Sequence, residues 1–257
     1  MRISTSLLAA AAAFAVAAPA FASTTIEFSN IRAEWFGVQG GAGLGFNGQG
    51  TPNAEVSWGE GGNKSGYRFD AIGIPELTVD PVTQTSATVN IGQFTHFNFP
   101  INSGSSITGV KLQFTTDVLV NATQFQDIEF VYAFDHFETP NGDDPCADGG
   151  QQGVGINDNG CADRVGVNFN QQSGFFTIDD VEYALDVRGF LVGNDPANLF
   201  WTREGADNVA FLRGQVVLRS TAGAIPEPAT WAMLIAGFGM VGFAARQRKA
   251  GFDAVTA

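Results

Sequence analysis

Short runs of alternating apolar and polar residues recur through the middle of this chain, and they limit its fold more than any other feature does. Residues two apart point to the same face of a β-strand, so each run is typical of a strand with one buried face. No segment between Ser23 and Pro228 keeps a helical period over twelve residues. The alternating runs are 110–115, 128–134, 165–169 and 181–187, with shorter pairs at Val209 and Phe211 and at Val217 and Arg219. Many short strands separated by turn-forming residues predict an all-β domain, an antiparallel β-sandwich of jelly-roll-like type.

Size and composition agree with this prediction. Residues 23–220, the predicted domain, are enough for one sandwich with a sizeable core. The 23 Phe residues of the chain supply large apolar side chains for that core. Eleven glycines lie between Gly37 and Gly66, and we interpret this stretch as long loops over the sandwich. A phosphate-binding loop is disfavoured there, because the sequence contains no Gly-Lys-Ser/Thr.

Acidic residues dominate the segment from Ser23 to Pro228. It holds 25 Asp and Glu against 9 Lys and Arg, which is a net charge of −16. Such a surface repels nucleic acid and anionic lipid, and it favours solubility or cation binding. We therefore exclude nucleic acid as a partner.

The first 22 residues have the pattern of a signal peptide. Arg2 supplies the charged start, an apolar stretch runs from Leu7 to Ala18, and Ala20-Phe21-Ala22 is a small-x-small cleavage site. We expect signal peptidase to cut after Ala22, so that the exported protein begins at Ser23.

The other end of the chain has the pattern of a membrane anchor. After a linker, 221–228, an uncharged apolar run extends from Ala229 to Ala245. About 17 residues is the lower limit for an α-helix that crosses a bilayer. Basic residues directly after such a helix mark its cytoplasmic side. We predict a transmembrane helix with its basic stop at 229–249, followed by a short tail at 250–257.

This tail resembles the PEP-CTERM sorting signal. The resemblance implies that exosortase, a membrane-embedded transpeptidase-like enzyme of Gram-negative bacteria, recognises the tail and cleaves near the Pro-Glu-Pro. It also implies transient anchoring in the inner membrane and delivery to the cell surface or extracellular matrix. Residues 250–257 continue past the point where such signals usually stop, and a plain C-terminal anchor is the alternative. The matching residues are Pro226, Glu227, Pro228, Trp231, Gly237, Gly239, Arg246, Arg248 and Lys249.

Both histidines of the chain lie in copies of one short pattern. Residues 94–100 and 134–140 share Phe-x-His-Phe-x-x-Pro. Either equivalent strand ends recur in two halves of the sandwich, or the match is chance in a Phe-rich chain. Thr95, His96 and Asn98 in the first copy resemble the signature of a PEP-CTERM subfamily named for its Thr-His-x-Asn motif.

We favour a structural role for this motif. Ser, Thr, Asn and similar side chains often bond nearby backbone groups, so we expect His96 and Asn98 to fix a turn at a strand end. Metal binding is the weaker alternative, because zinc needs three or four ligands and the chain has two histidines without helical spacing. Catalysis is weaker still, because the Gly-x-Ser-x-Gly frame of a nucleophile is missing.

The two cysteines, Cys146 and Cys161, are predicted to form a disulfide, because the exported compartment is oxidising. A two-thiol metal site is the alternative. Around them lies an acidic, glycine-rich loop with the hard oxygen ligands that Ca²⁺ prefers. We weigh Ca²⁺ binding against a solvated surface loop, and no other cofactor is indicated. The candidate Ca²⁺ ligands are Asp143, Asp144, Asp148, Asp158 and Asp163.

We expect a structural or exopolysaccharide-associated surface protein without enzymatic activity. A carbohydrate-binding or adhesive module is the alternative. A glycoside hydrolase is a weaker alternative, because it needs two carboxyl groups about 5–9 Å apart. Glu34 beside Trp35, and Glu204 near Trp201, offer the pairing of acid and aromatic ring that sugar sites use.

Overall fold

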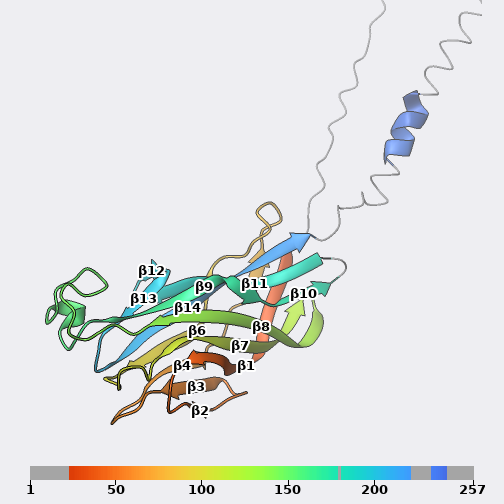
Figure 1. Cartoon of the computed structure of the whole chain (residues 1–257). Helices are drawn as coiled ribbons and strands as arrows, with labels where there is room; N and C mark the ends of the chain where they lie inside the picture. The colour runs from red at the N-terminus through yellow and green to blue at the C-terminus, as the bar shows by residue number, and fades with distance from the viewer. Residues whose placement is uncertain (1–22, 179–180, 221–232, 242–257) are drawn as a thin grey trace, which may run out of the picture.

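The structure is a computed structural model, and it describes residues 23–178, 181–220 and 233–241. Two curled antiparallel sheets make up the domain (Figure 1). In spatial order, the six-stranded sheet contains β13 (Leu199–Thr202), β9 (Asp163–Ser173), β8 (Thr123–Phe137), β7 (Ile107–Val120), β1 (Thr24–Gly40) and β5 (Leu77–Val79). The eight-stranded sheet contains β10 (Phe175–Ile178), β11 (Val181–Val192), β14 (Ala206–Ser220), β6 (Val89–Asn98), β4 (Ser65–Ala71), β3 (Asn53–Trp58) and β2 (Gly45–Asn47), with β12 (Asp195–Ala197) paired to β11. The predicted all-β antiparallel fold is confirmed.

One aromatic-rich core fills the space between the sheets. On β7 the alternation is clear: Val110, Leu112 and Phe114 are buried, and the residues between them are more exposed. The burial of each large apolar side chain contributes roughly 1.5–3 kcal/mol relative to an exposed one. The largest fully buried side chains are Trp35, Trp58, Tyr67, Tyr132, Phe69, Phe94, Phe114, Phe130, Phe134 and Phe190.

The strand predicted around 209–219 is confirmed as β14 (Ala206–Ser220), whereas the interpretation of the glycine-rich stretch as loops was incomplete. On β14 the buried residues are Ala210, Leu212 and Val216, whereas Val209 lies on the outer face with 47% of its surface exposed. The apolar pair at 209 and 211 therefore marks the opposite face from the one that packs in the core. The glycine-rich stretch also contains more than loops, because β3 within it buries Val56 and Trp58.

The ends of the chain lie mostly outside the described residues. The predicted signal peptide, 1–22, the linker, 221–228, and the tail, 250–257, are among the parts left undescribed. Of the predicted transmembrane segment at 229–249, only 233–241 are described, and they form a helix. Among the described residues, no helix has both the length and the hydropathy to span a bilayer.

Candidate functional site

The two histidines face one another across the sandwich. His96 lies on β6 of the eight-stranded sheet, and His136 lies on β8 of the six-stranded sheet. Their ring centroids are 5.3 Å apart, and the residues are 0% and 5% exposed. The preceding residues of the repeat, Phe94 and Phe134, stack on each other at 5.3 Å. The repeated Phe-x-His-Phe thus places a matched pair of rings in each sheet.

Aromatic rings enclose both imidazoles. The Trp58 ring lies 5.9 Å from that of His96 and 5.1 Å from that of His136. The Tyr67 ring lies 5.0 Å from His96. Trp58 and Tyr67 are fully buried, so the imidazoles lie in a medium of low polarity. Burial, reinforced by the neighbouring His136, lowers the pKa of His96 well below its ordinary value.

Three carboxylates meet beside the histidines. Asp163 begins β9, Glu138 follows β8, and Glu204 lies between β13 and β14. Ligand atoms of these three residues all lie within 4.8 Å of one another. Asp163 also forms a second such group with His96 and His136, within the same distance. We call these five residues the buried polar cluster.

The Thr202 hydroxyl anchors the ring of His96. Nδ1 of His96 lies 2.8 Å from the hydroxyl oxygen, and that oxygen also lies 3.2 Å from the backbone carbonyl of Asp163. When the hydroxyl donates to this carbonyl, the Nδ1–H of His96 is the donor to Thr202 and Nε2 carries the lone pair. This Nε2 is buried and has no hydrogen-bond partner.

His136 is held in a similar way. The hydroxyl of Tyr67 lies 2.6 Å from its Nδ1, and its Nε2 lies 3.3 Å from Oε2 of Glu138. Because a tyrosine hydroxyl both donates and accepts, Tyr67 can support either neutral tautomer of His136.

The carboxylates are incompletely satisfied. Oδ1 of Asp163 accepts the backbone N–H of Thr139 at 2.7 Å, but its Oδ2 is buried without a partner. Both carboxylate oxygens of Glu204 are also buried without a hydrogen-bond partner. Burial and the nearby Glu138 raise the pKa of Glu204 to about 7. The same two causes raise the pKa of Asp163. Buried, unpaired carboxylates of this kind are costly to fold and are usually found with a partner.

We had expected the Thr-His-x-Asn residues to fix a local turn by side-chain hydrogen bonds. The structure shows long-range hydrogen bonds instead. His96 bonds the side chain of Thr202, 106 residues away in sequence. Asn98 donates to the backbone carbonyl of the same Thr202 at 3.1 Å. Thr95 is buried, and its hydroxyl has no partner. The motif therefore joins β6 to β13, because the long-range packing of the strands places these groups together.

The predicted Ca²⁺ ligands separate in the structure. Asp163 joins the buried polar cluster, whereas Asp148 accepts two hydrogen bonds from Asn157 at 3.0 Å and Asp158 pairs with Arg203. Asp143 and Asp144 are exposed. In the described part of the chain, the groups with converging metal-ligating atoms include only Asp163 of these five. Cys146 and Cys161 form a disulfide, with Cα atoms 5.3 Å apart.

Glu138 was missed as a site residue, and Glu204 was considered only for sugar chemistry. A signal for Glu138 existed, since it lies two residues after His136 within the second copy of the repeat. Glu204 has no comparable signal, because it is 108 residues from His96 and reaches the cluster only through the pairing of β13 and β14 with their neighbours.

Comparison with known proteins concerns the tail. Residues 224–249 match the family model described as the PEP-CTERM protein-sorting motif. The tail of the chain therefore carries this sorting motif, which is typical of exported proteins that exosortase sorts, and the match does not extend into the folded domain. The Pro-Glu-Pro resemblance is confirmed by this match, and membership of the Thr-His-x-Asn subfamily stays a prediction. None of the curated proteins matches the chain.

Proposed function

We propose that this protein is a structural component of the cell surface or its exopolysaccharide matrix, and that it acts without catalysis. The observation that carries this proposal is the sorting motif at 224–249, joined to a sandwich whose two sheets share one filled core. In the proposed sequence of events, signal peptidase cuts after Ala22 and the tail holds the chain transiently in the inner membrane. Exosortase then cleaves near Pro226-Glu227-Pro228. The prolines keep that segment extended and accessible.

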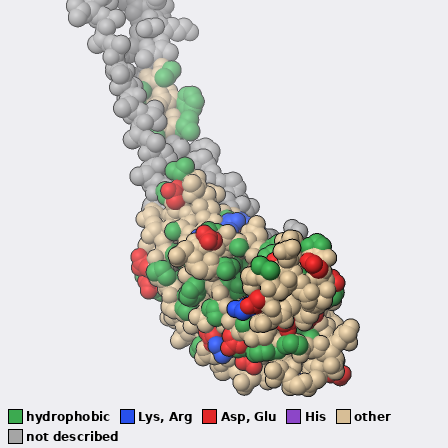
Figure 2. All heavy atoms as spheres, turned by 90° about the vertical axis from the view of Figure 1, so that its left-hand side faces the viewer, with side chains coloured by type: hydrophobic (Ala, Val, Ile, Leu, Met, Phe, Trp, Pro, Cys, Tyr) green, Lys and Arg blue, Asp and Glu red, His purple; other side chains and the backbone are tan. Residues whose placement is uncertain are grey.

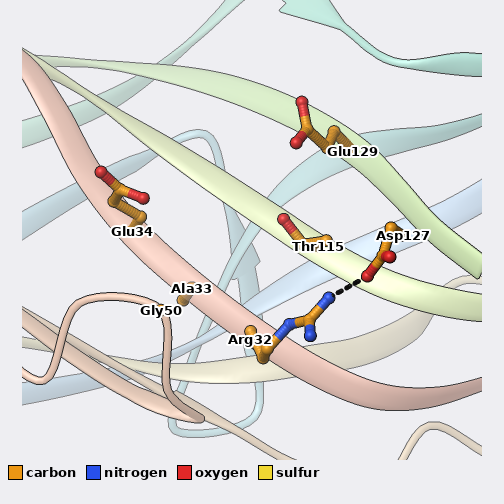
Figure 3. Close-up of a pocket in the computed structure, with 7 residues that line it drawn as sticks. All are labelled: Arg32, Ala33, Glu34, Gly50, Thr115, Asp127 and Glu129. Carbon is orange, nitrogen blue, oxygen red and sulfur yellow. Dashed lines mark hydrogen bonds and ion pairs between the residues drawn. The ribbon is translucent and has the colours of Figure 1, made fainter.

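The positions of the aromatic residues support a non-catalytic role. Trp35 is 2% exposed, and its indole N–H donates to the carbonyl of Ala54 at 3.0 Å. Its ring is therefore closed to a sugar, although Glu34 next to it is accessible. Figure 3 shows Glu34 in an open depression with Thr115 and Glu129, beside the ion pair of Arg32 and Asp127. The residues that line this depression include no aromatic ring for stacking.

To test the sorting step, Pro226-Glu227-Pro228 is replaced by Ala-Ala-Ala in the native host. We expect the variant to accumulate at precursor size in the inner membrane, and the wild type to reach the surface in processed form. Immunoblots of inner-membrane and surface fractions measure this. Processing and surface delivery at the wild-type level would contradict the proposal.

A carbohydrate-binding function is a second candidate, and one surface groove favours it. Phe97 on β6 and Phe99, which follows the end of that strand, line this groove together with Glu55, Ser57 and Lys64. Both rings are partly exposed, and an accessible aromatic ring next to hydrogen-bonding groups is suited to a sugar. The guanidinium of Arg68 also lies over the Phe97 ring, at 5.1 Å.

Binding of the full chain to a glycan array tests this candidate. If the groove binds sugar, Phe97→Ala combined with Phe99→Ala should abolish the signal. Phe175→Ala, which removes a 60% exposed ring on β10, serves as the matched control and should retain it. A signal that survives the double substitution would place any sugar site elsewhere.

A further inference from the structure

We propose that the buried polar cluster binds one divalent transition-metal ion of the Zn²⁺ type, with His96, His136 and Asp163 as ligands and a carboxylate of Glu204 or Glu138 completing the site. This site is independent of the sorting function. Four steps support it: the orientation of the imidazoles, the charge, the choice of metal and the elements that supply the ligands.

The histidines are arranged as metal ligands usually are. A ligating imidazole typically donates one ring N–H to a fixed partner, and this bond sets the tautomer and orients the other nitrogen toward the metal. The contact between Nδ1 of His96 and the Thr202 hydroxyl orients the ring in this way, and Nε2 of His96 is buried without a hydrogen-bond partner. Tyr67 fixes the ring of His136 through its Nδ1 at 2.6 Å, and Nε2 of this ring faces Oε2 of Glu138 at 3.3 Å. One ring nitrogen of each imidazole and one carboxylate oxygen of Asp163 lie within 4.8 Å of one another.

The cluster lacks a counter-charge. Three carboxylates face two imidazoles, and among the described residues no Lys or Arg forms an ion pair with Asp163 or Glu204. The nearest basic residues in sequence are used elsewhere: Arg203 pairs with Asp158, and Arg164 lies over the ring of Phe137. Buried charges are stable when they are paired or when they coordinate a metal. A divalent cation supplies the missing positive charge and contacts the unpartnered oxygens directly.

The mixture of ligands indicates which ions fit. Imidazole nitrogens suit Zn²⁺ and its transition-metal neighbours, whereas Ca²⁺ and Mg²⁺ prefer sites made of oxygen alone. Two histidines with two carboxylates complete a tetrahedral zinc site. A site with four protein ligands has no open position for a substrate, and such closed sites are structural. The aromatic rings of Trp58 and Tyr67 close the cluster on the side of the core.

The proposed ligands come from both sheets and from the connections β8–β9, which holds Glu138, and β13–β14, which holds Glu204. His96 is on the eight-stranded sheet, His136 and Asp163 are on the six-stranded sheet, and Glu204 lies between β13 and β14. One ion at this place therefore ties the two sheets together at the end of the domain that carries the β8–β9 connection, at the left of Figure 1. Figure 2 looks onto this end.

Metal exchange on the full chain tests the proposal. Protein purified in detergent, with its disulfide intact, is unfolded in guanidinium with a chelator and refolded with Zn²⁺, Ca²⁺, Mg²⁺ or no metal. After gel filtration we expect one zinc per chain by elemental analysis, and a melting temperature several degrees above that of the metal-free protein. Ca²⁺ and Mg²⁺ should leave the melting temperature unchanged. Failure to retain zinc would overturn the proposal, and so would an equal shift with Ca²⁺.

Ligand variants locate the ion. Asp163→Asn and His96→Gln should lose the bound zinc and the rise in melting temperature. Glu129→Gln changes an accessible carboxylate on the outer face and should keep both, so it controls for zinc held by the acidic surface. Thr202→Val leaves every ligand in place and removes the group that orients His96. We expect it to weaken zinc binding about 10–100-fold, as the loss of such an outer partner does elsewhere. Zinc binding at the wild-type level in Asp163→Asn would refute the assignment.

A fluorescence measurement guards against variants that fail to fold. Co²⁺ is paramagnetic, so at this site it should quench the fluorescence of Trp58, whose ring lies within 6 Å of both imidazole centroids. Trp58→Phe should abolish that part of the quenching, while Co²⁺ still raises the melting temperature. Quenching that is unchanged in Trp58→Phe would place the ion elsewhere and overturn the proposal.

Discussion

At the scale of single residues, Tyr67 belongs both to the aromatic core and to the buried polar cluster. Its ring packs against Trp35, Trp58 and Phe94, and its hydroxyl bonds Nδ1 of His136 at 2.6 Å. Burial raises the pKa of this tyrosine, with smaller contributions from nearby carboxylates led by Asp163. The hydroxyl therefore keeps its proton at neutral pH and serves His136 as a neutral partner.

We predict that Tyr67→Phe lowers the free energy of unfolding by about 1–3 kcal/mol, because it leaves His136 Nδ1 buried without its partner. Tyr67→Leu also removes the ring contacts and should cost more. Chemical denaturation of metal-free protein measures both. Unchanged stability in Tyr67→Phe would show that the hydrogen bond contributes nothing.

Asp80 provides a pH-dependent test outside the cluster. Its carboxylate accepts the backbone N–H groups of Thr83 and Val82, at 2.9 and 2.7 Å, and these bonds lower its pKa. A lowered pKa in the folded state gives stability that is present above the unfolded pKa and is lost as the pH falls through the folded value. Asp80→Ala should therefore lower the melting temperature at about pH 7, and the difference should disappear at about pH 2. The exposed Glu76→Ala controls for the loss of one charge, and a difference that persists in acid would contradict this account.

At the scale of elements, β14 shows how a strand is assigned to its faces. Val209 and Phe211 are apolar and indicate a strand, but the residues that this strand buries include Leu212 and Val216. Cross-strand pairing decides which face of β14 turns toward the core, because Leu212 pairs with Phe190 on β11 and with Gly92 on β6. A shift of one residue along a strand exchanges its two faces.

We predict that Leu212→Ala lowers the free energy of unfolding by about 2–5 kcal/mol, the usual range for a cavity in a packed core. Val209→Ala on the same strand should change it by no more than about 0.5 kcal/mol. Urea denaturation compares the two. Equal losses would mean that the faces of β14 are reversed.

The β8–β9 connection holds the cluster from one side. The disulfide of Cys146 and Cys161 joins residues 15 apart within it, and Thr139 bonds Asp163 where the connection begins and ends. Closing a loop of this length contributes about 3 kcal/mol in the chain-entropy account. We predict that replacing both cysteines by Ser lowers the free energy of unfolding by about this amount. The affinity for zinc should fall as well, because Asp163 lies only two residues after Cys161. If the replacement leaves zinc binding unchanged, the β8–β9 connection does not position this ligand.

At the scale of the whole molecule, the domain separates its buried polar cluster from the point where the chain leaves it. Strand β14 begins beside Glu204 and ends at Ser220. Fifteen residues of strand span roughly 45 Å. Among the described residues, the core extends from Ile26 to Val216 and includes none of residues 233–241. The sorting motif and the folded domain thus come from separate segments of the chain.

A chain that ends at Ile225 tests this separation. We expect it to be exported without surface anchoring, and to melt within about 2 °C of the full chain, because the core loses no residue. Differential scanning calorimetry of both proteins measures the comparison. A markedly lower melting temperature for the shortened chain would show that the tail supports the domain.

Features that depend on neighbours in sequence could be predicted from the sequence alone. Alternation at 110–115 and 181–187 indicated strands, because side chains two apart share a face in any sheet. The sorting motif is contiguous, so its residues identify it without a fold. The two cysteines had only each other as partners in the chain.

The buried polar cluster was decided by tertiary structure. Its members lie on β6, β8, β9 and the β13–β14 connection, and His96 and Glu204 are 108 residues apart. Sequence spacing carries no information on which strands pair across two sheets, or on which face of a strand like β14 turns inward. Asp163 looked like a ligand for a surface ion, and the pairing of β9 with β8 and β13 placed it against two histidines instead. The histidines and carboxylates of the cluster come together only because strand pairing brings the ends of these strands to the same place in the fold.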